Sequence, residues 1–81
     1  MKPKLTVLSR EYCHLCEELL AGLKQFQARY DFEIEVVDVD RHPKLEEKWG
    51  DKVPVLFDGD QEICHYYLDP EAVDARLSRM K

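Results

Sequence analysis

The sequence predicts an α/β fold with a four-stranded mixed sheet, helices on both faces and the element order β-α-β-α-β-β-α. Three observations carry this prediction. A short apolar run is followed by apolar residues at helical spacing, then by alternating apolar and acidic residues, and two later apolar runs flank a tight turn. With 81 residues the chain has room for one domain, which we expect to span residues 1–81.

The first strand is predicted at Leu5 to Leu8, a short apolar run typical of a strand buried on both faces. The next segment has the buried stripe of a helix, made of Leu15, Leu19, Leu23, Phe26 and Tyr30. Residues 32–39 then predict a second strand, with Phe32, Ile34 and Val36 on one face and glutamates between them. Because a helix connects these two strands, they should be parallel.

A short second helix is predicted after residue 42. Pro43 suits its first position, and Leu45 and Trp49 lie one turn apart on its apolar side. Gly50 is expected to close the helix in the left-handed conformation.

The last part of the chain predicts a hairpin and a third helix. The runs Val53 to Phe57 and Gln61 to Tyr66 flank Asp58-Gly59-Asp60, whose glycine supplies the positive φ of a tight turn, so these strands are antiparallel. The helix should start at Asp69-Pro70, which suit a cap and a first helical position. Its stripe consists of Val73, Leu77 and Met80.

The composition excludes several classes of function. Twelve basic and 17 acidic side chains give a net charge of −5, and no basic face is visible, which argues against nucleic acid as a partner. The longest apolar run contains Pro54 and falls far short of the roughly 20 residues that a membrane helix needs. No secretory leader is recognisable. We therefore expect a soluble cytoplasmic protein, most simply a monomer, that does not contact a membrane.

The clearest chemical motif is the Cys-x-x-Cys pair of Cys13 and Cys16, placed where the first strand ends and the first helix begins. At this spacing in a helical turn the Cα atoms lie about 5–6 Å apart, a separation at which a disulfide closes without strain. The helix N-terminus stabilises a thiolate at Cys13, and Arg10 and protonated His14 would act in the same direction. The two glutamates that follow Cys16 oppose them.

Together with the element order, the motif Ser-Arg-Glu-Tyr-Cys-His-Leu-Cys and the run Lys52 to Phe57 resemble small glutaredoxin-like members of the thioredoxin superfamily, over nearly the whole chain. The resemblance implies that Cys13 is the nucleophile and Cys16 the resolving thiol. It also implies a cis Val53-Pro54 bond, in a loop that presents backbone to an extended substrate. The residues expected to contact substrate are Arg10, Tyr12, His14, Val53 and Pro54.

The chain departs from the glutaredoxin pattern at three places. His14 stands where a proline usually follows the first cysteine, and Lys52 stands where a threonine usually precedes Val-Pro. Cys64-His65 replaces the Gly-Gly that lets glutathione approach the backbone in that family. Residues 38–43 and 48–50 resemble thioredoxins at least as well, so the reductant stays open.

Three functional hypotheses follow. The leading one is a thiol-disulfide oxidoreductase that acts on a disulfide-containing protein or a small thiol. It needs no metal or organic cofactor, and glutathione as co-substrate, a thioredoxin-reductase-type flavoenzyme or a partner protein would restore the dithiol. The second is a metal or iron-sulfur module that uses Cys13, Cys16, Cys64 and His65. The third is a redox-silent domain that binds a peptide beside Pro54. For Cys64 itself, we expect a small buried apolar residue in a strand.

Overall fold

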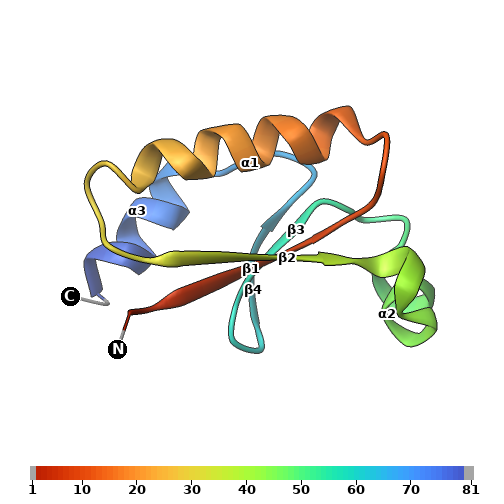
Figure 1. The fold of residues 1–81 in the computed structure, drawn as a ribbon. Helices are drawn as coiled ribbons and strands as arrows, with labels where there is room; N and C mark the ends of the chain where they lie inside the picture. Colours follow the sequence, from red (N-terminus) through yellow and green to blue (C-terminus); the bar gives the residue numbers. More distant parts are fainter. Residues whose placement is uncertain (1, 80–81) are drawn as a thin grey trace.

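A computed structural model describes residues 2–79 of the chain and has the predicted element order (Figure 1). The elements are β1 (Lys4–Ser9), α1 (His14–Phe26), β2 (Glu33–Asp38), the 3₁₀ turn η1 (Val39–Arg41), α2 (Pro43–Trp49), β3 (Val55–Asp58), β4 (Gln61–His65) and α3 (Pro70–Arg79). The predicted α/β class with a four-stranded mixed sheet is confirmed.

The strands lie in the order β2-β1-β3-β4. β1 and β2 are parallel, whereas β3 is antiparallel to both β1 and β4. The register pairs Ser9 with Asp38, Leu8 with Val55, and Val55 with His65. One step further along the same pairing, Ser9, Pro54 and Tyr66 follow each other across one end of the sheet, where β1 leads into α1.

Helices cover both faces of the sheet, as expected, but not equally. α1 and α3 lie on one face and α2 lies on the other, beside the end where α1 begins (Figure 1). The larger core cluster joins the sheet to α1 and α3; its buried members are Leu5, Val7, Leu19, Leu23, Phe26, Phe32, Leu56, Val73 and Leu77. The smaller cluster, under α2, is built on Leu8, Val39 and Val55. The short α2 leaves a hollow of about 470 Å³ beside Trp49 and Phe57.

The two open ends of the described chain lie away from α2. β1 starts, and α3 finishes, at the end of the molecule opposite the start of α1 (Figure 1). The C-terminal helix begins as predicted, because the carboxylate of Asp69 accepts a hydrogen bond from the backbone N–H of Ala72 over 3.2 Å. Val73 and Leu77 are buried, while Met80 lies outside the described residues.

Two apolar residues lie elsewhere than their spacing predicts. α1 ends at Phe26, so Tyr30 is in the turn after the helix, where its hydroxyl donates to Asp74 of α3 over 2.7 Å. Val36 is 52% exposed although it shares the parity of Ile34. The reason is that β2 is an edge strand and that the irregular β1–α1 loop leaves a hollow of about 170 Å³ beside Val36.

The two glycines with predicted turn conformations differ from each other. Gly59 has φ 60 in the hairpin turn, as expected. Gly50 has φ −55, so the expected left-handed ending of α2 is wrong. A Cβ at this position would instead meet the carbonyl and the carboxylate of Glu46, and glycine is the residue that fits there. Close approach of neighbouring atoms, not a positive φ, is the requirement at Gly50.

Candidate active site

Cys13 is the N-cap of α1, and its backbone is extended, with φ −109 and ψ 106. Its sulfur accepts a hydrogen bond from the backbone N–H of Cys16 over 3.2 Å. Its carbonyl accepts the first intrahelical bond, from the N–H of Glu17, over 3.1 Å. Because free N–H groups and the positive end of the helix dipole meet at this sulfur, the position favours negative charge on it.

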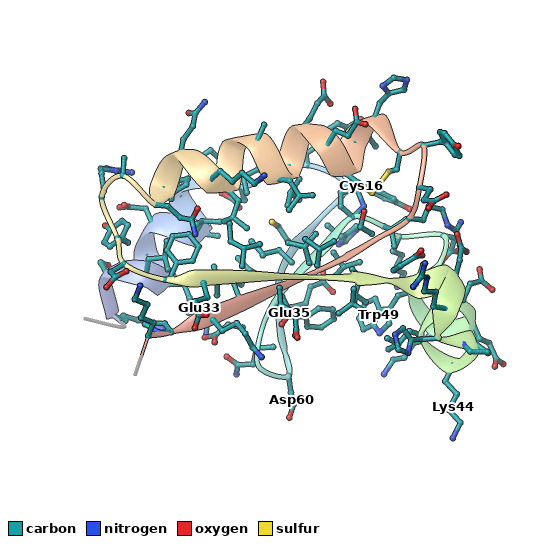
Figure 2. The ribbon with its side chains drawn as sticks, viewed as in Figure 1. Cys16, Glu33, Glu35, Lys44, Trp49 and Asp60 are labelled. Carbon is teal, nitrogen blue, oxygen red and sulfur yellow. A yellow bond between two sulfur atoms is a disulfide. The ribbon has the colours of Figure 1, made fainter. Side chains whose placement is uncertain are left out.

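Cys13 and Cys16 form a disulfide with a Cα–Cα distance of 5.2 Å, within the range predicted from their spacing. The two residues differ in access. Cys13 is partly exposed, whereas Cys16 is 2% exposed and lies between the first turn of α1 and the sheet (Figure 2). An incoming disulfide can therefore approach Cys13 from solvent, and Cys16 is reached through Cys13.

The residues on either side of Cys13 face solvent. Tyr12 is 97% exposed and has φ 59, a backbone region that favours glycine over a bulky side chain. This conformation turns the chain out of the β1–α1 loop, so that the next residue can cap the helix. His14 is exposed as the first residue of α1. Both predicted substrate contacts thus lie beside the partly exposed cysteine.

Arg10 ties the β1–α1 loop to the opposite face of the sheet. Its guanidinium donates to Asp40 of η1 over 3.0 Å and to Glu46 of α2 over 3.2 Å. The hydrogen bond to Glu46, together with the nearby charge of Asp40, raises the pKa of Arg10. Glu46, on the exposed side of α2, is therefore an ion-pair partner of the β1–α1 loop. With two carboxylates beside it, Arg10 adds less positive potential to the cysteine pair than a free guanidinium would.

The Val53-Pro54 peptide bond is cis, as the resemblance implied. Pro54 is fully buried, and Val53 is half-buried against the smaller core cluster. Since Pro54 follows Ser9 across the sheet end, the loop at residues 51–54 lies next to the end of β1, which leads into the loop and helix that carry the cysteine pair. The sheet register thus brings together two motifs that lie some forty residues apart in the sequence.

Tyr66 is the site residue that the sequence did not single out. Its backbone N–H donates to the carbonyl of Pro54 and its hydroxyl donates to the carbonyl of Asp51, each over 2.8 Å. Adjacent tyrosines after a strand suggest packing, and nothing in the spacing points to the loop before β3. Only the β3–β4 register, which places Tyr66 beside Pro54, could have indicated this contact.

Cys64 and His65 do not join the cysteine pair in a metal site. Cys64 is half-buried against the larger core cluster, and burial raises the pKa of its thiol. His65 is paired with Glu62 of the same strand. Within residues 2–79, no three His, Cys, Asp or Glu side chains are grouped so that they could hold a metal ion. The geometry therefore gives no observation in favour of the metal hypothesis.

Residues 4–78 match the family described as glutaredoxin-like domain (DUF836). The chain belongs to this family. A Nitrosomonas europaea protein with a solution NMR structure is 44% identical, with a TM-score of 0.85, over 95% of this chain and 93% of its own. A protein from X. campestris, with an X-ray structure, is 29% identical with a TM-score of 0.75, over 95% of this chain and 99% of its own.

More distant matches show the fold of this glutaredoxin-like domain. Thioredoxin 1 from Thermosipho africanus is 21% identical, with a TM-score of 0.62, over 94% of this chain and 96% of its own. The thioredoxin-like class predicted from the sequence is thereby confirmed. An uncharacterized Mycobacterium tuberculosis protein is 24% identical over 96% of this chain and 86% of its own.

Across residues 2–79, no helix has the length and apolar character to span a membrane.

Proposed function

We propose that this glutaredoxin-like domain is a thiol-disulfide oxidoreductase in which Cys13 attacks and Cys16 resolves. The supporting observation is the difference in access between two cysteines only 5.2 Å apart at Cα. A partly exposed sulfur at a helix N-terminus is suited to attack, and a buried partner within reach is suited to displace the product. The family membership and the thioredoxin-like fold support a redox role for the pair.

The reaction starts from the reduced protein. The Cys13 thiolate attacks one sulfur of a substrate disulfide in line, so a mixed disulfide forms and the other substrate sulfur leaves as a thiolate. Cys16 then loses its proton and attacks the Sγ of Cys13. The Cys13–Cys16 disulfide forms, and the second substrate sulfur leaves. Two electrons have passed from the protein dithiol to the substrate, whose two thiolates take up protons.

The oxidised pair needs an external thiol or dithiol to return it to the reduced state. Glutathione as co-substrate, a reductase or a partner protein each supply the two electrons, so the proposal needs no resident metal or organic cofactor. The substrate class is a protein disulfide or a small-molecule disulfide. A monomer with one partly exposed cysteine, Cys13, suffices for every step.

A glutathione redox titration tests the proposal. The protein, in a Cys64→Ser background so that only the pair titrates, is equilibrated over a range of reduced-to-oxidised glutathione ratios. Thiols are then trapped, and intact mass is recorded. We expect a single two-electron transition, with loss of two hydrogens per protein. A pair that stays reduced at every ratio would contradict the proposal and would favour the redox-silent peptide-binding domain.

The assigned roles of the two cysteines are tested by single substitution. In Cys16→Ser the mixed disulfide on Cys13 has no resolving thiol, so a covalent adduct with a peptide disulfide should accumulate. Cys13→Ser should form no adduct at all. The reverse pattern, with an adduct on Cys16 in Cys13→Ser, would show that the roles are exchanged.

A further inference from the structure

Tyr66 fastens both ends of the loop at residues 51–54. Its backbone N–H reaches the carbonyl of Pro54, and its hydroxyl reaches the carbonyl of Asp51, each over 2.8 Å. One residue after β4 thereby holds the loop that enters β3. A third bond, from the N–H of Lys52 to the carbonyl of Trp49 over 2.8 Å, joins the same loop to the end of α2.

The backbone of Tyr66 is unusual for its residue type. It has φ 64, in a region that favours glycine. This geometry continues the β3–β4 pairing by one hydrogen bond beyond His65, while the phenol ring reaches back to Asp51. The ring also meets the imidazole of His65 edge-on, with centroids 4.8 Å apart, and His65 is itself held by Glu62. Hydrogen bonds of the backbone and of the hydroxyl, together with the ring contact to His65, thus fix the orientation of Tyr66.

Val53 lies between the two anchored positions, and its backbone groups are free. Within residues 2–79 neither the N–H nor the carbonyl of Val53 has a hydrogen-bond partner. An unpaired backbone N–H and an unpaired carbonyl on the same residue can form hydrogen bonds with an extended peptide. The orientation of these groups relative to Cys13 depends on how firmly the loop is held.

We propose that Tyr66 is a positioning residue, which fixes the Val53 backbone beside Cys13 and so governs the binding of extended disulfide substrates. This inference rests on the proposed function. Tyr66 takes no part in electron transfer. Its effect should therefore fall on substrate binding and leave the chemistry of the cysteine pair unchanged.

The test compares Tyr66→Phe with Tyr67→Phe. Phenylalanine keeps the ring but removes the hydroxyl, and Tyr67 is a matched control because its hydroxyl makes no hydrogen bond among residues 2–79 and it is 69% exposed. The probe is a synthetic peptide with an internal disulfide, turned over with dithiothreitol as electron source. A second measurement omits the peptide: stopped-flow kinetics give the rate at which dithiothreitol alone reduces the Cys13–Cys16 disulfide.

Loss of one hydrogen bond of ordinary strength should raise KM for the peptide about two- to tenfold in Tyr66→Phe. Both kcat and the rate of reduction by dithiothreitol should stay at the wild-type values, and Tyr67→Phe should match wild type throughout. An unchanged KM would overturn the proposal. So would a parallel fall in kcat and in the dithiothreitol rate, because that would indicate general damage to the site.

Amide hydrogen exchange separates this inference from the proposed function. If the wild type reduced no peptide disulfide, the proposed function would fail, yet the loop could still be examined. Tyr66→Phe should then speed exchange at the N–H of Lys52 relative to Tyr67→Phe, because the loop loses its anchor at Asp51. Equal exchange in the two variants would show that Tyr66 does not hold the loop.

Discussion

The chain keeps cysteines in two different settings. Cys13 and Cys16 lie at the start of α1, where the helix N-terminus faces one sulfur and the partner thiol is within bonding distance. Cys64 lies in β4 against the larger core cluster, half-buried, with its pKa raised by burial. The same side chain lies where negative charge is stabilised in one region, and where burial favours the protonated thiol in the other.

The difference shows that local structure, more than residue type, decides what a cysteine can do. A helix N-terminus lowers the cost of a thiolate, and an apolar environment raises it. A bulge in β4 adds to the apolar environment of Cys64. Leu56 pairs with Cys64 and Phe57 with Glu62, so Ile63 is the extra residue, and both Ile63 and Cys64 pack on the larger cluster.

Single substitutions should separate the two settings most strongly. Cys13→Ser should lose all disulfide reductase turnover, because a hydroxyl at this position forms no nucleophilic anion at neutral pH. Cys64→Ser should keep turnover within about twofold of wild type. This substitution changes one atom in the core and leaves the cysteine pair in place. Peptide disulfide reduction measures both. Comparable losses in the two variants would remove the distinction between the settings.

Alkylation of the reduced protein should show the same contrast as a difference in labelling rate. With iodoacetamide at neutral pH, Cys13 should be labelled at least about ten times faster than Cys64, because only the thiolate reacts. Since the pKa of Cys64 is raised from its ordinary value of 9.0, its labelling rate should still be increasing above that pH. Peptide mapping by mass spectrometry across pH gives both rates. A plateau for Cys64 below pH 9 would contradict a buried, protonated thiol.

Denaturant unfolding should show that Cys64 contributes to packing. Cys64→Ser places a hydroxyl in a half-buried apolar position and should lower the free energy of unfolding by about 1 kcal/mol. Cys64→Ala, which introduces no polar group, should cost less. Denaturant titrations of the oxidised protein measure the two values. A larger loss in Cys64→Ala would mean that volume, and not polarity, dominates at this position.

The smallest expected effect concerns Arg10 and its carboxylates. Glu46→Gln removes one of two exposed ion pairs and should lower the unfolding midpoint by at most a few degrees, with a smaller effect at high salt. The redox midpoint of the cysteine pair should move little, because Asp40 still pairs with the guanidinium of Arg10 in this variant. Glu47→Gln is the control, since Glu47 makes no ion pair within the described chain. A shifted midpoint in Glu46→Gln alone would show that Arg10 does tune the pair.

Much of the fold could be predicted because it depends on local patterns. The caps at Asp69 and the turn at Gly59 follow from residue chemistry, and the strand-helix junction at Cys13 follows from a change of periodicity. The burial of a side chain depends on what another element places over it. Val36 has the parity of a buried residue, but it lies on an edge strand, where the β1–α1 loop leaves a hollow beside it.

The candidate site divides in the same way. The cysteine pair and the Val-Pro loop are readable from short motifs, whereas Tyr66 and the Glu46 partner of Arg10 are not. The Tyr66 contact depends on the pairing of β4 with β3, and the Arg10 contact spans 36 residues between a loop and α2. Gly50 shows a related difficulty, because a glycine after a helix fits both a left-handed cap and a close contact, and the sequence does not distinguish them.

The direction of the chain has a practical consequence. β1 enters, and α3 leaves, the domain at the end away from the cysteine pair (Figure 1). A polypeptide linker joined before Lys4 or after Arg79 therefore emerges behind the reactive surface. The domain can be immobilised on an electrode or a sensor chip, or placed in tandem with a second module, with the start of α1 and its N-cap Cys13 at the opposite end.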